Sequence, residues 1–314
     1  MKIKKEYIIL IVIIAALCGY LYFKRADRVH YELPDVSAVK AQELTKIEIK
    51  SGQDSIMLIK KDETWHISEQ EYPADAKKAQ NILNVFKDLI ITDLVSQSGN
   101  YVLYDLGDDS KISVKAYAGS ELIREFDIGK KAPTNRHTFI RLEGDDKVYQ
   151  AKGDFRKQFE TTVADLRDKR VLTFDPAEIT ALTISAAQKD ITLTKEQIPA
   201  EEAKTQAGEE TKTSQWKDQS GTIIENAAID KLLGTLSALN CEEYLEDKTK
   251  ADLASPETTI TLSGTGQYSL SLFAAEAEKK PASSSENEYV FVLPDYLMDN
   301  IEKSMEELMD VPGK

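Results

Sequence analysis

The chain has 314 residues, of which 41% are hydrophobic and 30% are charged, and its net charge is −14. This length accommodates one large domain or two ordinary domains, and the composition is that of a folded globular protein. Because so acidic a body repels phosphate backbones, the charge argues against nucleic acid as a partner.

The N-terminal segment is strongly apolar. Residues 7–23, "YIILIVIIAALCGYLYF", contain no charged side chain and follow the basic start "MKIKKE". At ~1.5 Å rise per residue, such a helix just spans a hydrocarbon core of ~30 Å, at the short end of the usual range. We therefore expect a cytoplasmic tail over 1–6, a transmembrane anchor over 7–23 and a linker over 24–43.

Two alternatives to an anchor are weaker. A cleaved signal peptide would be cut near Ala16 or Cys18, yet the apolar run continues past both residues. A lipidated Cys18 is disfavoured because Leu17 is too large for the position before it. Cys241 is alone outside this segment, so no disulfide is expected. An anchor preceded by lysines predicts a single-pass membrane protein, with its N-terminus inside and its C-terminal body extracytoplasmic.

The chain then repeats itself. Residues 44–61, "LTKIEIKSGQDSIMLIKK", align without a gap with residues 179–196, "ITALTISAAQKDITLTKE". In both segments apolar and polar residues alternate, which predicts strands with one buried face, joined by hairpin turns. The only two tryptophans, Trp65 and Trp216, follow at matching positions and are expected on equivalent strands.

A helix is expected after each of these sets of strands. Residues 72–89, "YPADAKKAQNILNVFKDL", and residues 225–240, "ENAAIDKLLGTLSALN", each carry an apolar stripe at helical spacing. The ends of the two repeats also align, 147–166 with 289–308, and each end predicts a terminal helix. The two stripes consist of Ala79, Ile82, Leu83, Phe86 and Leu89, and of Ile229, Leu232, Leu233, Leu236 and Leu239.

The shared unit is therefore predicted as β-β-β-α-β-β-β-β-α. Runs of strands with hairpin-length connections predict an α+β fold with mostly antiparallel sheets packed with helices, rather than a doubly wound parallel sheet. The first repeat is expected over 44–168 and the second over 175–311. Two stretches poor in bulky apolar residues, 196–215 and 276–288, are expected to be disordered insertions in the second repeat.

Several of these stretches are similar to one known family. "LTKIEIKSG", "YPADAKKAQNILN", "YDLGDDSKISV", "DIGKKAP" and "DKVYQAKGDFRKQF" resemble the domain of unknown function 4340 family, in order, over about 44–170. The resemblance implies an anchored bacterial protein, which places the single-pass anchor in the bacterial cytoplasmic (inner) membrane. Members are often encoded beside ABC-type transport components of the gliding-motility-auxiliary kind. The resemblance supplies no catalytic residues, because none is established for the family.

One basic stretch is a candidate contact site. In "DIGKKAPTNRHTF", 127–139, the glycine and the two lysines are similar to a phosphate loop, but the GxxxxGK[ST] spacing is absent and no helix follows. We expect a basic hairpin between strands, either a solvated turn or a contact surface for a protein partner or an anionic glycan. The candidate partner-contact residues are Gly129, Lys130, Lys131 and Arg136.

The other chemistry-bearing residues give weaker signals. The three histidines form no metal-binding motif, and His66 is expected to face solvent on its strand. Paired aspartates within 107–111 and 143–148 lack the alternating oxygen ligands of a calcium loop. Because no nucleophile motif occurs either, no catalytic residue, cofactor or metal is predicted.

Two functions remain open. The first is a non-enzymatic, membrane-anchored extracytoplasmic accessory or binding protein that joins a protein partner in an ABC-type transport or cell-envelope system. The alternative is an envelope hydrolase or glycan-processing enzyme that uses carboxylates in a cleft between the repeats. Acids with perturbed pKa values in such a cleft would favour the enzyme, and a smooth apolar groove would favour the accessory protein.

Overall fold

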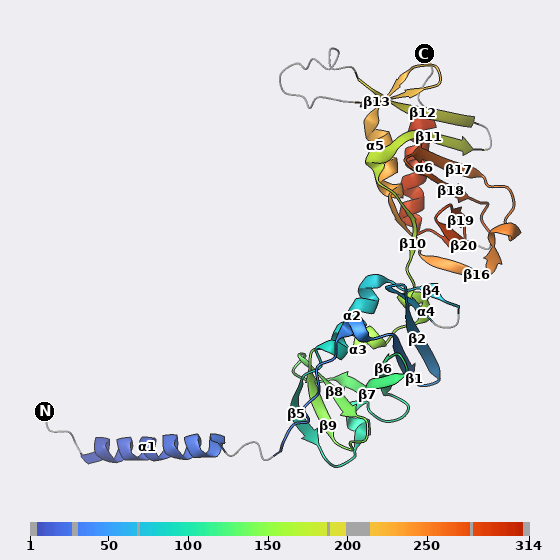
Figure 1. Ribbon diagram of the computed structural model, residues 1–314. Coiled ribbons are helices and arrows are strands. Elements are labelled where there is room, and N and C mark those ends of the chain that lie inside the picture. The colour runs from blue at the N-terminus through green and yellow to red at the C-terminus, as the bar shows by residue number, and fades with distance from the viewer. Residues whose placement is uncertain are drawn as a thin grey trace. The chain divides into compact units, whose positions relative to one another are not determined.

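The computed structural model describes residues 5–26, 31–67, 70–186, 189–198, 214–276 and 279–309. The chain divides into two compact units, the first Met1–Asp168 and the second Lys169–Lys314. Each unit contains a large antiparallel β-sheet with helices (Figure 1).

The N-terminal helix, α1 (Lys5–Ala26), corrects one prediction. Among the described residues, no helix is long and apolar enough to cross a membrane. Two charged residues begin this helix and two more lie near its end, so its uncharged part falls short of the roughly 20 apolar residues that usually span a bilayer. The transmembrane helix of the predicted fold class, and the inner-membrane location that rested on it, are therefore wrong.

The first unit contains a nine-stranded sheet in the order β4-β3-β2-β1-β6-β7-β8-β9-β5. Neighbouring strands are antiparallel throughout. Alternate residues of the central strands are buried, which follows from the period-2 pattern. The strands are β1 (Lys46–Ser51), β2 (Asp54–Lys61), β3 (Thr64–Ile67), β4 (Tyr72–Pro73), β5 (Ile91–Ser96), β6 (Ile112–Ala118), β7 (Glu121–Lys131), β8 (His137–Leu142) and β9 (Val148–Lys152).

Helix α2 (Ala76–Lys87) packs on one face of this sheet. It begins after Asp75, whose carboxylate accepts a hydrogen bond from the Lys78 backbone N–H and so satisfies a free donor of the first turn. Its buried side chains are the first four of the predicted stripe, and the fifth, Leu89, is buried just after the helix ends. Phe86 is fully buried and meets Phe126 of the sheet edge-on, with ring centroids 5.6 Å apart.

The described part of the predicted linker is packed on the first unit. Val39 is buried, and the residues before it contact the same core. Arg124, on β7, donates one hydrogen bond to the Phe86 carbonyl at the end of α2 and another to the Ser37 carbonyl. One buried side chain therefore holds both the helix and the incoming chain against the sheet.

The terminal helix of the first repeat is divided in two. Helix α3 (Arg156–Phe159) ends before Thr162, which caps α4 (Val163–Leu166). The Thr162 hydroxyl accepts from Asp165 N and the Asp165 carboxylate accepts from Thr162 N, a reciprocal cap that starts a new helix. The corresponding segment of the second unit is one continuous helix, α6 (Asp295–Met309).

The second unit repeats the same strand order. Its nine-stranded sheet runs β14-β13-β12-β11-β17-β18-β19-β20-β16, and a two-stranded ribbon, β10-β15, lies outside it. The ribbon strands are β10 (Arg170–Thr173) and β15 (Ala238–Asn240). The sheet strands are β11 (Ile179–Ala186), β12 (Lys189–Gln197), β13 (Ser214–Asp218), β14 (Ile223–Ile224), β16 (Glu243–Thr249), β17 (Thr258–Gly264), β18 (Gln267–Leu272), β19 (Pro281–Ser284) and β20 (Asn287–Val292).

The two tryptophans occupy equivalent positions in the two sheets. Trp65 on β3 lies opposite Lys60, and Trp216 on β13 lies opposite Lys195. These lysines are themselves equivalent, because β1 pairs with β2 in the same register as β11 with β12. The prediction of matching tryptophans is therefore confirmed, although Trp216 is buried and Trp65 only half-buried.

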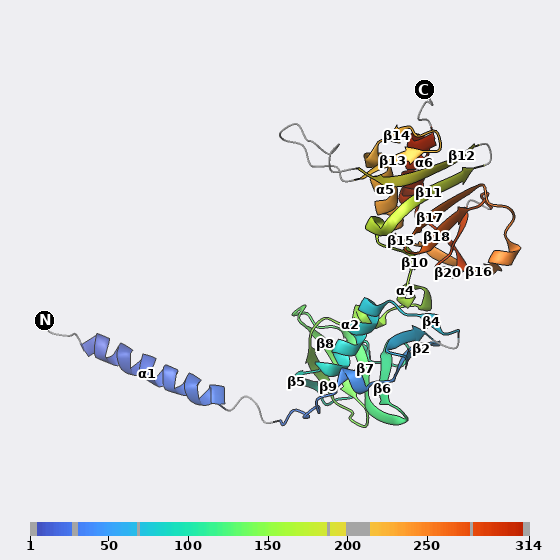
Figure 2. The ribbon, with the colours of Figure 1, turned by 45° about the horizontal axis from the view of Figure 1, so that its top comes forward.

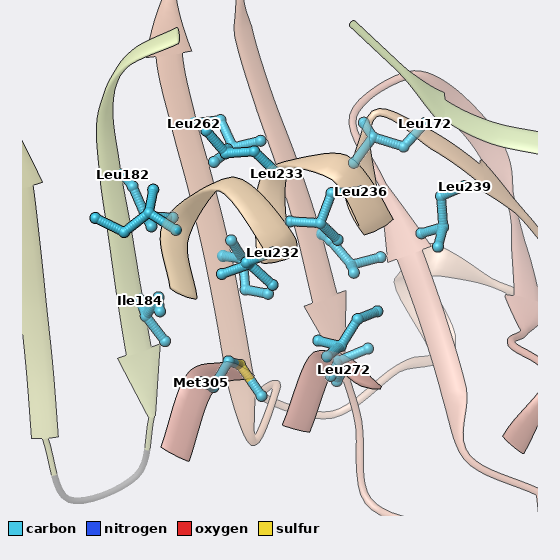
Figure 3. Close-up of a cluster of buried hydrophobic side chains, with 14 of the residues drawn as sticks. Leu172, Leu182, Ile184, Leu232, Leu233, Leu236, Leu239, Leu262, Leu272 and Met305 are labelled. Atoms are coloured by element: carbon cyan, nitrogen blue, oxygen red, sulfur yellow. The ribbon is translucent and has the colours of Figure 1, made fainter. Parts of the chain in front are cut away.

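Helices α5 (Asn226–Leu236) and α6 pack on one face of the second sheet (Figure 2). The leucines of α5, among them Leu232 and Leu236, point toward sheet residues such as Leu182 and Leu272 (Figure 3). Met305 from α6 joins the same cluster. The second stripe of the sequence is thus the second core.

The strand count differs from the predicted one. A two-residue strand, β4 or β14, precedes the main helix in each unit, and five sheet strands follow it where four were expected. The disordered insertion predicted over 276–288 is wrong, because β19 and the start of β20 lie there. Ala282 is buried and the Ser284 hydroxyl donates to the Val171 carbonyl, so small residues fill this part of the sheet. Of the insertion predicted over 196–215, 199–213 lie outside the described residues.

Candidate functional site

The predicted contact loop lies on a hairpin of the first unit. β7 ends at Lys131 and β8 begins at His137. Lys130 and Arg136 are exposed on either side of the turn. The Thr134 hydroxyl and the His137 Nδ1 atom are 3.0 Å apart across it. The basic side chains are thus presented on an ordered turn between two strands.

Gly129 has a packing role at this hairpin. A Cβ atom at this position would lie 2.2 Å from the Tyr104 carbonyl oxygen. Tyr104 ends the 3₁₀ turn η2 (Tyr101–Tyr104), and its ring meets Phe139 of β8 with centroids 4.9 Å apart. The glycine therefore allows η2 to lie directly on β7, and this contact accounts for it without a phosphate loop.

Two pockets lie beside α2 in the first unit. The first has a volume of about 280 Å³ and lies between α2 and the α3–α4 segment. The second has a volume of about 270 Å³ and lies between α2 and the end of β9. Asn81 and Gln158 line both. The first is also lined by Lys78, Lys157, Glu160, Thr161, Asp165 and Leu166.

Gln158 joins the two pockets. Its Oε1 atom is buried and, within the described part of the chain, has no hydrogen-bond partner. A buried acceptor without a donor costs free energy. An N–H or O–H group of a ligand would remove that cost once the Gln158 side chain turns its Oε1 atom toward a pocket.

The predicted loop borders the second pocket. Gly153 lines this pocket and donates its backbone N–H to the Arg136 carbonyl at 2.8 Å. Lys131 pairs with Asp154, another lining residue, at 3.1 Å. We call five cations along the loop and the pockets the basic edge; they are Lys130, Lys131, Arg136, Lys152 and Lys157. Lys78 also lines the first pocket but is not included, because its ammonium group donates to the Asp165 carbonyl.

The acidic side chains around the pockets are engaged in local structure. Glu160 pairs with Arg156 at 2.5 Å, and Asp165 caps α4. By contrast, among the residues that the structure describes, Lys152 and Lys157 have no carboxylate partner within 4.0 Å. The charges of Lys152 and Lys157 are therefore available to a ligand, whereas Lys131 is paired with Asp154.

The pockets were not predicted from the sequence. Asn81 lies on α2 and Gln158 on α3, and no motif links two such residues. In the sequence, the feature that points to this surface is the polar side of α2, opposite its buried stripe. Lys78, on that side, also donates to the Asp165 carbonyl, so one lysine of the first turn connects α2 with α4.

The weaker candidates serve local structure. His66 was expected to face solvent, but it is half-buried on β3, and its Nδ1 atom has no hydrogen-bond partner among the described residues. Asp145 accepts a hydrogen bond from the Tyr149 hydroxyl at 2.7 Å, and Asp108 pairs with Lys111 at 3.2 Å. Over the described ranges, no group of three or more His, Cys, Asp or Glu side chains could hold a metal ion. The enzyme alternative stays a prediction.

Comparison with known families gives one match. The family described as "Domain of unknown function (DUF4340)" matches residues 65–259, a stretch that contains α2, the basic edge and α5. No curated protein and no solved structure matches the chain. Because the matched residues make up more than half of the sequence, the chain belongs to the DUF4340 family.

Proposed function

We propose that this protein is a non-enzymatic binding protein whose first unit holds an acidic segment of a protein partner. The observation that carries the proposal is the pair of pockets along α2, joined at Gln158 and bordered by the basic edge. The Gln158 side chain, the cations of the basic edge and the two pockets lie together, and polar binding sites usually combine groups of these kinds.

The size of the pockets favours single side chains over a whole metabolite. At about 280 and 270 Å³, each lies just below the ~300–1,000 Å³ of typical small-molecule sites. Two neighbouring pockets of this size suit successive side chains of an extended peptide. The peptide backbone supplies N–H groups, which are the donors that the Gln158 Oε1 atom lacks.

The charge of the site favours an acidic segment. The five cations of the basic edge lie beside the pockets, in a unit whose 26 basic and 27 acidic residues nearly balance. Exposed charges of this kind contribute more to the orientation and rate of association than to affinity. An acidic peptide would therefore be guided to the pockets and held there mainly by contacts within them.

The family resemblance supplies the class of partner. We place the partner among the proteins of ABC-type transport or cell-envelope systems, because the resemblance implies ABC-type transport components encoded beside this protein. This part of the proposal rests on the resemblance alone. The pockets and the basic edge support only the binding role.

Photocrosslinking in living cells tests the proposal. A benzoylphenylalanine residue in place of Asn81, which is exposed and lines both pockets, should form a covalent adduct with one protein. Lys231 is the matched control, because it holds the corresponding position relative to the buried stripe of α5. Changing Lys152 and Lys157 to glutamate should abolish the Asn81 adduct.

Three results would contradict the proposal. They are the absence of any adduct from position 81, equal adducts from positions 81 and 231, and an adduct from position 81 that survives the charge reversal. Circular dichroism of the purified variants should show that each one is folded, since both lysines are exposed.

A further inference from the structure

The outer face of the second sheet, opposite α5 and α6, carries two rows of hydroxyl side chains. The first row crosses β12, β11, β17 and β18 as Thr192, Thr183, Thr261 and Ser269. The second crosses β11, β17, β18 and β19 as Ser185, Thr259, Ser271 and Ser283. We call these eight side chains the hydroxyl rows.

The pairing register gives the rows a regular geometry. Members of one row lie directly opposite each other on adjacent strands, so they repeat at the strand spacing of about 4.8 Å. The two rows are two residues apart along the strands, a separation of about 6.8 Å. The face is therefore a two-row array of hydroxyl groups.

The hydroxyls retain hydrogen-bonding capacity. Thr183 and Thr192 are 3.3 Å apart between their Oγ1 atoms, and Thr259 and Ser271 are 3.3 Å apart between their hydroxyl oxygens. All eight side chains are half-buried. Each hydroxyl has one donor and two acceptor positions, so contacts within the array leave acceptors and donors for a ligand.

The first sheet shows that the fold does not require hydroxyls at these positions. Its corresponding residues are Met57, Glu48, Lys115 and Glu125 in one row and Lys50, Ser113, Asp127 and Arg141 in the other. Ion pairs connect them, including Lys115 with Glu125 at 2.8 Å and Arg141 with Asp127 at 2.6 Å. Strand propensity accounts for threonine in a strand, but not for the absence of charge at all eight of these positions in one copy. The charged neighbours of the rows on this face are Asp190, opposite Ser185, and the Lys217–Glu196 ion pair on β12 and β13.

The surrounding charge restricts the ligand. Residues 169–314 contain 14 lysine and arginine residues against 27 aspartate and glutamate residues, a net charge of −13. The hydroxyl rows include no cation that could pair with an anion. An anionic ligand would be repelled by such a unit, so the face suits a neutral one.

We propose that the hydroxyl rows bind a neutral polysaccharide. The hydroxyl groups of a sugar chain both donate and accept hydrogen bonds, as the rows do. An extended chain that crosses the strands would meet a pair of protein hydroxyls on each of β11, β17 and β18, and a single hydroxyl on β12 and on β19. This inference is independent of the pockets of the first unit and stands on a different surface.

The composition of the rows also predicts how the binding behaves. Each contact is a neutral hydrogen bond, and none of the eight residues is aromatic, so affinity arises from many weak contacts along the chain. Because no ion pair is involved, binding should not depend on salt, in contrast to binding that is driven by charge.

A pelleting assay with the full-length protein tests the proposal. The protein should sediment with microcrystalline cellulose or with chitin and not with an anionic polygalacturonate gel, and raising NaCl from about 0.1 M to about 1 M should leave the bound fraction unchanged. The double variant Thr183→Val, Thr261→Val should bind about tenfold more weakly, since it loses two hydroxyl contacts. Ser55→Ala with Ser113→Ala, on the outer face of the first sheet, is the matched control and should bind normally.

Several outcomes would overturn the proposal. These are no sedimentation with either neutral polysaccharide, binding that salt abolishes, and a valine variant that binds as the natural protein does. Valine keeps the shape of threonine and favours strands, so the variant should fold, and Trp216 fluorescence would report this. Self-association in sedimentation velocity that the valine variant loses would instead assign the rows to a second copy.

Discussion

The two units share one strand order but present different surfaces. The first, residues 1–168, has 26 basic and 27 acidic residues and a net charge of −1, whereas the second has a net charge of −13. Ion pairs cross the middle of the outer face of the first sheet, and hydroxyl rows cross the middle of that of the second, where the Lys217–Glu196 ion pair lies to one side on β12 and β13. The pockets along α2 lie in the first unit, where the terminal helix is split.

This difference indicates where function lies. Both cores keep the same helical stripe, with Phe86 in the first at the position of Leu236 in the second. A core needs apolar residues of suitable volume in the right pattern, so it tolerates such exchanges. Surfaces carry no such requirement, and function resides in sites placed on a fold. The features that differ between the copies are therefore the best functional candidates.

The largest expected effect comes from breaking one core and leaving the other intact. Phe86→Ala should lower the free energy of unfolding of the first unit by ~3–5 kcal/mol, from lost transfer energy plus a cavity. Leu236→Ala should lower that of the second by ~2–5 kcal/mol. Each unit contains one tryptophan, so Trp216→Phe and Trp65→Phe backgrounds allow each transition to be followed by fluorescence.

The two units would not have independent cores if one substitution changed the stability of both. Phe86→Ala should move the Trp65 transition in urea and leave the Trp216 transition in place. A harmless Phe86→Ala, or equal shifts of both transitions, would contradict two separate cores.

A smaller effect is expected from a matched pair of glycines. Gly129→Ala should destabilise the first unit by ~1–3 kcal/mol, because the added Cβ overlaps the Tyr104 carbonyl that lies on β7. Gly234→Ala, on α5, meets no atom within 4 Å and should stabilise the second unit by up to ~1 kcal/mol through helix propensity. Chemical denaturation measures both changes, and a Gly129→Ala variant that is as stable as the natural protein, or more stable, would refute the packing role of Gly129.

The smallest effect concerns acid stability of the first unit. Burial acts to raise the pKa of Asp145, but hydrogen bonds from the Tyr149 hydroxyl and the Lys147 backbone N–H outweigh it, so the pKa is lowered. Because the pKa of this carboxyl is lower in the folded than in the unfolded state, its ionised form stabilises the fold at pH values above the unfolded-state pKa. This stabilisation is lost as pH falls through the folded-state pKa. Tyr149→Phe should therefore cost ~0.5–1.5 kcal/mol at neutral pH and progressively less below about pH 4.

Urea unfolding at several pH values measures this difference. Asp145→Asn is the control, since it removes the titrating group, and Tyr149→Phe should then have no pH-dependent effect. A cost of Tyr149→Phe that is constant from neutral to acid pH would show that the hydroxyl contributes through something other than this carboxylate.

Local periodicity was a sound guide to the cores. The alternation in β1 and β11 and the stripes of α2 and α5 follow directly from backbone geometry, so they could be predicted. The two-residue strands β4 and β14 and the strand β19 could not be predicted in this way. Hydrogen bonding to neighbouring strands holds them in place, and they do not carry an alternation of bulky apolar side chains. The apolar run of 7–23 was over-interpreted, since its length lies at the limit of what spans a bilayer.

The sequence by itself determined the duplication, the antiparallel α+β character, the core stripes and the basic hairpin. These depend on residues close together in the chain, where period and turn chemistry are sufficient. Only the tertiary structure decided that Asn81 and Gln158 share two pockets, that Gly129 lies under η2 and that eight hydroxyls form two rows. Such contacts join residues far apart in the chain, and they depend on strand order and register, which local periodicity does not encode.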